Sequence, residues 1–186
     1  MSSLKWKSDV KQWNNLEKDT ASLILNQAES LLRETVETAK TISLKAEKLI
    51  TILIPLESGI VLYFIDSSKE IGFTFLNITA ILTFIIIGLS LYFTSKNFKH
   101  YEISVPGEFP DKILTSAFID TVFKNDEQYL NMVFNICENL QERITINRNL
   151  NSIRTNNNRI SISILFLTPI CPFIAYLLCR VSEIHF

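Results

Sequence analysis

A long run without a charged side chain, Gly72 to Thr94, constrains this chain more than any other feature. A helix of roughly 20 residues, rising about 1.5 Å per residue, crosses the roughly 30 Å hydrocarbon layer of a bilayer. The run therefore predicts a transmembrane helix. Ile160 to Cys179 is a second uncharged run of sufficient length. Pro169 and Pro172 inside it predict a kink that neighbouring helices can accommodate.

A third apolar run, Leu49 to Ile65, is shorter and contains Pro55, Glu57 and Gly59. We expect it to be the first of three spans. Only the segment from Asp66 to Ile71 separates it from the next span, which is enough for a turn but not for a domain. The sequence therefore predicts an antiparallel transmembrane hairpin.

Lysine and arginine residues decide the expected orientation. Of the 18 in the chain, eight precede the first span and eight lie between the second and third spans. The hairpin holds only Lys69 and the tail only Arg180. Because positive residues concentrate in cytoplasmic loops, this distribution predicts a cytoplasmic N-terminus and a cytoplasmic central segment.

The predicted fold class is all-α: an integral membrane protein with a transmembrane hairpin, a third transmembrane helix and a cytoplasmic helical bundle. We divide the chain into a cytoplasmic amphipathic helix (1–48), the hairpin (49–94), cytoplasmic loop and helices (95–159), and the third span with a short tail (160–186). Scarce glycine and proline agree with a helical chain, because tight turns depend on both.

The segment before the first span has a heptad seam, in which apolar residues alternate between spacings of four and three. Only Thr35 breaks it; the seam comprises Ala21, Leu25, Ala28, Leu32, Thr35, Ala39, Ile42, Ala46 and Leu49. One interpretation is that this stripe packs on the protein's own central helices. The other is self-association between protomers, for which the candidate residues are Leu25, Leu32, Ala39, Ile42 and Ala46.

The central segment predicts a type II turn at Pro106-Gly107, a short helix over about Lys112–Phe123, and a long helix from about Glu127 through Arg159. Three asparagines share one face of the long helix: Asn131, Asn135 and Asn139. Codon composition explains their number without a function. The alternative is an asparagine-lined surface that forms hydrogen bonds across helices.

Glu57 is the residue singled out for function. An acid within an apolar span costs about 2.5–3.5 kcal/mol on insertion scales, so it usually faces water or a partner. In a ring of protomers it would line a cation-conducting pore. The alternative is that Pro55 and Gly59 break the helix and Glu57 caps a new turn. Four polar residues in the second span are expected to be satisfied within their own helix: Asn77, Thr79, Thr83 and Ser90.

Motifs for catalysis are absent from the sequence: no phosphate-binding glycine loop and no nucleophile elbow is present. We therefore assign no catalytic, cofactor-binding or metal-binding residue and expect no enzyme. Three cysteines without C-x-x-C spacing favour reduced thiols over disulfides or zinc. A net charge of −1 gives no reason to expect nucleic acid as a partner.

The size, the hairpin Leu49–Thr94 and the long helix feeding Ile160–Cys179 resemble small membrane effectors and accessory proteins of bacterial antiphage systems, including those attached to CRISPR, cyclic-nucleotide and retron systems. The resemblance implies a bacterial inner-membrane location, a homo-oligomer in the lipid bilayer, and a cytoplasmic part that responds to a signal or protein partner. It implies permeabilisation or depolarisation of the membrane. The alternative is a non-conducting anchor whose cytoplasmic helices recruit another protein.

Overall fold

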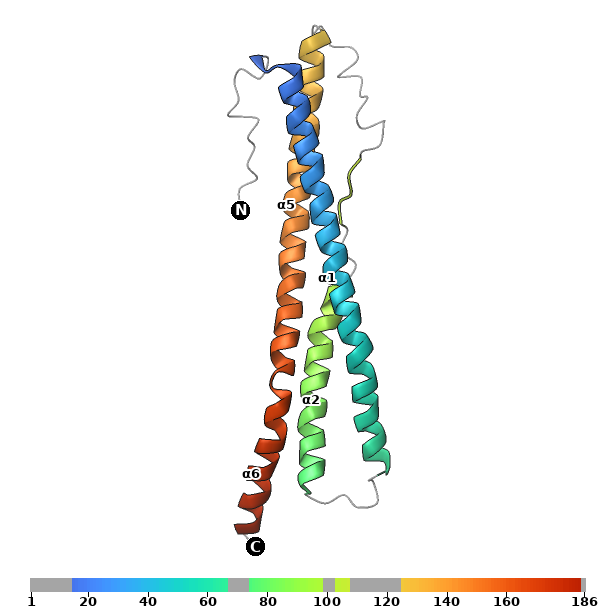
Figure 1. Cartoon of the computed structure of the whole chain (residues 1–186), viewed down its shortest axis with the longest axis vertical. Coiled ribbons are helices and arrows are strands. Elements are labelled where there is room, and N and C mark those ends of the chain that lie inside the picture. Colours follow the sequence, from blue (N-terminus) through green and yellow to red (C-terminus); the bar gives the residue numbers. More distant parts are fainter. Residues whose placement is uncertain (1–14, 67–73, 99–102, 108–124, 185–186) are drawn as a thin grey trace. The chain divides into compact units, whose positions relative to one another are not determined.

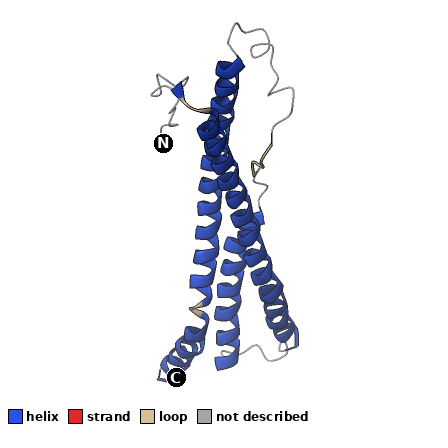
Figure 2. Ribbon diagram, turned by 45° about the horizontal axis from the view of Figure 1, so that its top comes forward, coloured by secondary structure: helices blue, strands red, loops and turns tan. Residues whose placement is uncertain are grey.

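The computed structural model describes residues 15–66, 74–98, 103–107 and 125–184. Within these ranges every regular element is a helix, which confirms the all-α prediction for this part of the chain. In chain order they are α1 (Lys18–Asp66), α2 (Phe75–Ser95), the 3-10 turn η4 (Lys96–Phe98), α5 (Asn125–Leu165), the 3-10 turn η5 (Thr168–Ile170) and α6 (Cys171–Ile184), as Figures 1 and 2 show. The helix expected over Lys112–Phe123 and the turn of the hairpin lie outside the described residues.

α1 is one continuous helix of 49 residues with Pro55 inside it. Asp19 lies in its first turn, where the partial positive charge of the helix end favours an acid. Alanine, leucine, glutamate and lysine are frequent along it and are strong helix formers. Pro55 removes one backbone hydrogen bond but does not end the helix, which continues to Asp66.

α2 begins at a side-chain cap. Thr74 is extended (φ −88°, ψ 152°), and its hydroxyl oxygen accepts a hydrogen bond from the Asn77 amide at 3.3 Å. This bond satisfies one of the amides that a helix start leaves without an intrahelical partner. The helix then carries no charged residue before Lys96.

The apolar run Ile160 to Cys179, the predicted third span, is divided between two helices. α5 ends at Leu165, η5 follows with Pro169 inside it, and α6 begins at Cys171. A proline inside a helix lacks the amide donor and clashes with the carbonyl four residues earlier. The kink predicted from Pro169 and Pro172 is therefore confirmed, as a break between α5 and α6. α6 packs against α2.

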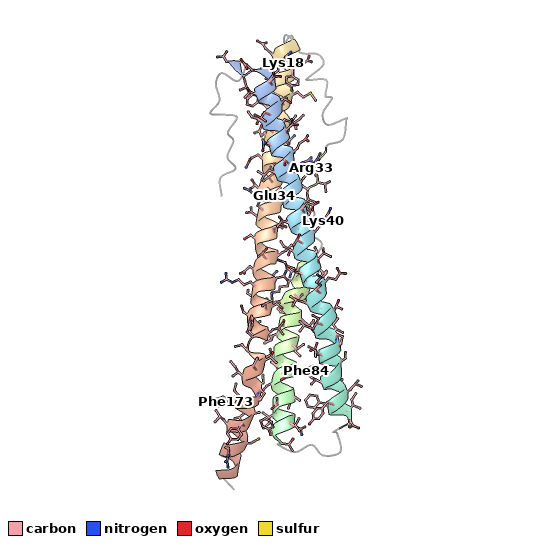
Figure 3. The ribbon with its side chains drawn as sticks, viewed as in Figure 1. Lys18, Arg33, Glu34, Lys40, Phe84 and Phe173 are labelled. Carbon is pink, nitrogen blue, oxygen red and sulfur yellow. The ribbon has the colours of Figure 1, made fainter. Side chains whose placement is uncertain are left out.

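Three helical stretches are long and apolar enough to cross a membrane: Lys18–Asp66, Phe75–Phe98, and Glu127–Arg180, which includes most of α5 and α6. Large apolar side chains along them are exposed, among them Phe84 and Phe173, both labelled in Figure 3. The charged residues labelled in Figure 3 (Lys18, Arg33, Glu34 and Lys40) all lie on the N-terminal part of α1.

The chain divides into two compact units. Unit 1 comprises Met1–Lys40 and Glu102–Asn151, and unit 2 comprises Thr41–Tyr101 and Ser152–Phe186. Each unit therefore takes one part of α1 and one part of α5. Unit 1 has an apolar core between these two helices. Unit 2 contains α2 and α6 together with its parts of α1 and α5.

Candidate functional site

Glu57 lies inside the apolar part of α1, where the helix is unbroken. The Ser58 hydroxyl donates to the Ile54 carbonyl at 2.8 Å, as expected four residues apart in a regular helix. No helix begins here, so the alternative in which Pro55 and Gly59 create a new turn capped by Glu57 is wrong. The acid is a side chain on a continuous helix.

The Glu57 carboxylate is half-buried and lies against α2 at Gly88. A Cβ atom placed on Gly88 would be 3.2 Å from Glu57 Oε1, so the glycine leaves room for the carboxylate. No hydrogen bond or ion pair to this carboxylate comes from the residues that the structure describes. Along α1 the nearest charged residues are Lys48 and Asp66, each nine positions away. Glu57 is therefore an acid in apolar surroundings.

A second contact joins the same two helices. The Tyr63 hydroxyl on α1 donates to Asn77 Oδ1 on α2 at 2.8 Å. The expectation that Asn77 is satisfied within its own helix is therefore wrong for its side chain. Thr79 follows the expectation, because its hydroxyl donates to the Phe75 carbonyl at 2.8 Å.

Ser90 and Thr94 on α2 and Ser161 on α5 form a cluster that we call the hydroxyl triad. The Ser161 hydroxyl oxygen lies 2.6 Å from that of Ser90 and 2.7 Å from that of Thr94. All three side chains are fully buried. Ser90 therefore bonds across helices, contrary to the expectation for it. Small hydroxyl residues permit close helix approach, and each hydroxyl of the triad has a partner.

An amide bridge, made of Asn97, Asn158 and the Ile42 carbonyl, links three helical elements of unit 2. Asn97 Nδ2 donates to Asn158 Oδ1 at 2.6 Å, and Asn158 Nδ2 donates to the Ile42 carbonyl at 3.4 Å. Asn97 Oδ1 is buried and has no hydrogen-bond partner among the described residues. Nearby along α5, the buried Arg154 donates to the Ser43 hydroxyl at 2.5 Å.

Asn147 on α5 holds the centre of a polar cluster in unit 1, the Asn147 clamp. Its Oδ1 accepts from the Ser104 amide at 3.0 Å, and its Nδ2 donates to the Ser104 carbonyl at 2.8 Å and to Thr35 Oγ1 at 3.0 Å. Asn151 Nδ2 donates to the Thr35 carbonyl at 2.8 Å. Thr35 and Asn151 also belong to the clamp, so within unit 1 Thr35, the break in the apolar seam, is hydrogen-bonded to α5 through both its hydroxyl and its carbonyl.

Arg143 holds the segment that follows Ser104. One of its guanidinium nitrogens, Nη1, donates to the carbonyls of Val105 and Gly107 at 3.2 and 2.7 Å. Gly107 has φ +102°, a left-handed value of the kind that the third position of a type II turn requires. The fourth residue of the turn expected at Pro106-Gly107 lies outside the described residues, so the turn stays a prediction.

The predicted seam is buried within one chain. Leu32, Ala39, Ile42 and Ala46 are buried, and Leu25 packs against both core clusters of unit 1. These clusters comprise Ala21 with Leu130, Val133 and Cys137, and Leu32 with Leu140 and Ile144. The burial favours packing on the protein's own helix, and self-association through these residues stays a prediction.

The apolar face in the first half of α5 is visible in the sequence, but sequence reasoning missed that the same heptad stripe continues, buried and polar, through the second half. Its buried positions are three and four apart throughout: Leu130, Val133, Cys137, Leu140, Ile144, Asn147, Asn151, Arg154, Asn158 and Ser161. Extending the spacing beyond Ile144 would have found the polar half. Asn131, Asn135 and Asn139, which we singled out, are not buried.

Within the described ranges no group of three or more histidine, cysteine or acidic side chains is placed to hold a metal ion. Protein-family models, curated proteins and solved structures provide no match to this chain. What the described residues offer is a pair of polar helix contacts, the hydroxyl triad and the amide bridge, and one acid without a partner inside an apolar helix.

Proposed function

We propose that this chain is a bacterial inner-membrane effector that oligomerises and permeabilises or depolarises the membrane when its cytoplasmic helices are triggered. The observation that carries the proposal is Glu57: its carboxylate lies against Gly88 in an apolar helix, without a hydrogen-bond or ionic partner among the described residues. An ionised acid in hydrocarbon is strongly unfavourable, so such residues usually line water-filled or ion-conducting paths.

The position of the acid along both helices supports this proposal. At about 1.5 Å per residue, Glu57 lies about 22 Å along α1 from Ile42. On the same scale, Gly88 lies about 14 Å along α2 from Asn97. The segments from Ile42 to Asp66 on α1 and from Asn97 to Thr74 on α2 are each about 35 Å long. Both distances therefore place the carboxylate in the middle third of its segment, far from either end.

Apolar surface supports assembly or lipid contact. Large apolar side chains in the apolar part of α1 are exposed in the single chain, among them Ile52, Leu56 and Leu62. In the proposed oligomer some of this surface contacts lipid and some contacts neighbouring protomers, so that several Glu57 carboxylates line one path. We expect cation preference from such a path because its charge is negative.

The proposed trigger acts through unit 1, where α1 and α5 pack through the two apolar clusters and the Asn147 clamp. Both helices continue from unit 1 into the apolar spans. A signal that binds one arrangement of this helix pair more tightly than another shifts the population towards that arrangement. A cytoplasmic protein partner fits this role.

One observation favours the alternative, a non-conducting anchor that recruits a protein. The seam residues proposed for self-association are buried inside the single chain, so unit 1 is a complete helix pair without a second protomer. In that function the apolar helices hold unit 1 at the membrane surface and Glu57 contacts another membrane protein.

Membrane potential separates the two functions. We would express the wild type, Glu57→Gln and Glu47→Gln from an inducible promoter in bacteria and record a potential-sensitive dye. Glu47 is exposed on the same helix, ten positions before Glu57, and is the matched control. A pore depolarises cells in the wild type and in Glu47→Gln, with a changed response in Glu57→Gln.

Purified protein in lipid vesicles removes the dependence on the host strain. We expect oligomers to release a trapped cation down its gradient, and Glu57→Gln to change the ratio of cation to anion flux. Oligomers that insert into vesicles and pass neither ions nor dye, with or without a unit 1 ligand, would support the anchor instead.

A further inference from the structure

We infer that the amide bridge lies at the lipid headgroup level of the cytoplasmic leaflet and marks the boundary between the membrane part and the aqueous part of the chain. The inference rests on the proposed membrane insertion and adds its register. The hydrogen bonds of the bridge join Asn97, Asn158 and the Ile42 carbonyl, so one residue from each of the three spans lies at the same level of unit 2.

The lengths of the three spans agree when they are measured from the bridge to the polar or charged residue at each far end. At about 1.5 Å per residue, Ile42 to Asp66 is about 36 Å, and Asn97 to Thr74 is about 35 Å. Asn158 to Arg180, which includes the break at η5, would be about 33 Å long as a continuous helix. A hydrocarbon core of roughly 30 Å accounts for most of each, and the remainder falls within the headgroup layers. Asp66, Thr74 and Arg180 then lie at the opposite surface.

Hydrogen bonding changes at the same level. On the span side, the three hydroxyls of the triad are fully buried and bonded to one another, as hydrocarbon surroundings require. At the bridge, Asn97 Oδ1 is buried without a partner among the described residues. An acceptor of this kind is satisfied by a buried water, which the hydrated headgroup layer can supply and the hydrocarbon cannot.

Aromatic and basic side chains mark the level independently. The Lys96 ammonium lies over the rings of Tyr92 and Phe93, 4.4 and 4.9 Å from their centroids. Tyrosine and lysine are typical of the membrane interface, where the ring is half in lipid and the ammonium reaches the phosphates. At the opposite surface, Arg180 and Tyr176 form a similar pair on α6, with the guanidinium carbon 5.8 Å from the ring centroid.

Charges along the chain are consistent with this boundary. Between Lys48 and Asp66, α1 has only Glu57, and α2 has no charge from Phe75 to Ser95. Three charged residues, Lys45, Glu47 and Lys48, lie on the span side of Ile42 and within two turns of it, where long side chains can extend back to the headgroups. The boundary between units, at Lys40 and Asn151, lies on the other side of the bridge.

Depth measurements on the full-length protein test the inference. Cysteine would be introduced at three exposed positions, Thr155, Ser95 and Ile85, and labelled with a nitroxide in phosphatidylcholine–phosphatidylglycerol vesicles. The unsubstituted protein gives the background from the native thiols. Relaxation by oxygen, which prefers lipid, is compared with relaxation by a water-soluble nickel chelate.

We expect nickel to dominate at Thr155, which lies on the aqueous side of Asn158, and both reagents to be comparable at Ser95. Oxygen should dominate at Ile85, about 18 Å along α2 from Asn97, with an oxygen-to-nickel ratio about tenfold or more above that at Thr155. An oxygen-to-nickel ratio typical of lipid at Thr155, or a ratio at Ser95 as high as that at Ile85, would overturn the assigned level while leaving insertion intact. Nickel access at all three positions would overturn both the level and the proposed insertion. Neither outcome depends on whether the protein conducts.

Discussion

Replacing Asn147 by alanine tests whether the clamp, rather than apolar packing alone, holds the Ser104 segment on α5. The side chain is almost fully buried and makes three hydrogen bonds, two to the Ser104 backbone and one to the Thr35 hydroxyl. A hydrogen bond contributes about 1 kcal/mol net to stability, so the substitution should destabilise the clamp by about 3 kcal/mol. About 2 kcal/mol of this falls on the contact with Ser104.

The measurement is amide hydrogen exchange of the full-length protein in lipid nanodiscs. A loss of about 2 kcal/mol in local opening free energy corresponds to about 30-fold faster exchange of the Ser104 amide, because about 1.4 kcal/mol is a factor of ten. The matched control is Asn149→Ala, an exposed asparagine two positions along the same helix. Unchanged exchange at Ser104 in Asn147→Ala, or an equal change in Asn149→Ala, would show that the Asn147 side chain does not hold the Ser104 segment on α5.

A double-mutant cycle isolates the bond between the two helices. Thr35→Val keeps the shape of the side chain and removes the hydroxyl that accepts from Asn147 and donates to the Leu32 carbonyl. We expect a coupling energy of about 1 kcal/mol between Thr35→Val and Asn147→Ala. Either substitution alone removes the hydrogen bond between the two side chains, so the double variant loses that bond only once. Strictly additive effects would show that the hydroxyl and the amide do not interact.

Three further predictions concern other parts of the chain. Ser161→Ala removes the central hydroxyl of the triad and should lower the unfolding free energy in detergent by about 1–2 kcal/mol, whereas exposed Ser163→Ala should leave it unchanged. Gly107→Ala should destabilise by about 1 kcal/mol through backbone strain, because φ is +102° and no atom of the described residues lies within 4 Å of the added methyl group. Gly59→Ala meets equally open space within a helix and should stabilise by up to about 1 kcal/mol; thermal unfolding that ranks the two glycine variants in the reverse order would contradict this. Burial raises the pKa of the Cys137 thiol, with a further contribution from the Glu29 carboxylate, so its alkylation should be slow at neutral pH and need a more alkaline solution than a free thiol. The same shift means that the contribution of this thiol to stability is present at neutral pH and is lost as pH rises through its folded-state pKa, which chemical unfolding at increasing pH would detect.

The helical spans were predictable from the sequence because hydropathy is a local property of the chain. Roughly 20 apolar residues without a charge favour a helix long enough to cross a membrane whatever their neighbours are. The break near Pro169 was predictable for the same reason, since proline acts on the carbonyl four residues before it. The left-handed φ of Gly107 likewise depends on a local preference, the conformational freedom of glycine.

Pairing between distant segments was beyond a single sequence. Asn147 and Thr35 are 112 positions apart, and Ser90 and Ser161 are 71 apart. Nothing local distinguishes these side chains from exposed neighbours such as Asn149 or Ser163. Polar residues in the second half of α5 also concealed a heptad spacing that the apolar first half made visible.

Helix propensity, proline placement and hydropathy act within a few residues, so the three apolar helices and the acid among them could be predicted from the sequence. The helix packing was needed to learn that α1 passes unbroken through Pro55, that Glu57 lies against Gly88, and that the amides of Asn97 and Asn158 bridge three helices. These features depend on which helix faces meet, and the packing of whole helices selects those faces after the local preferences have been satisfied.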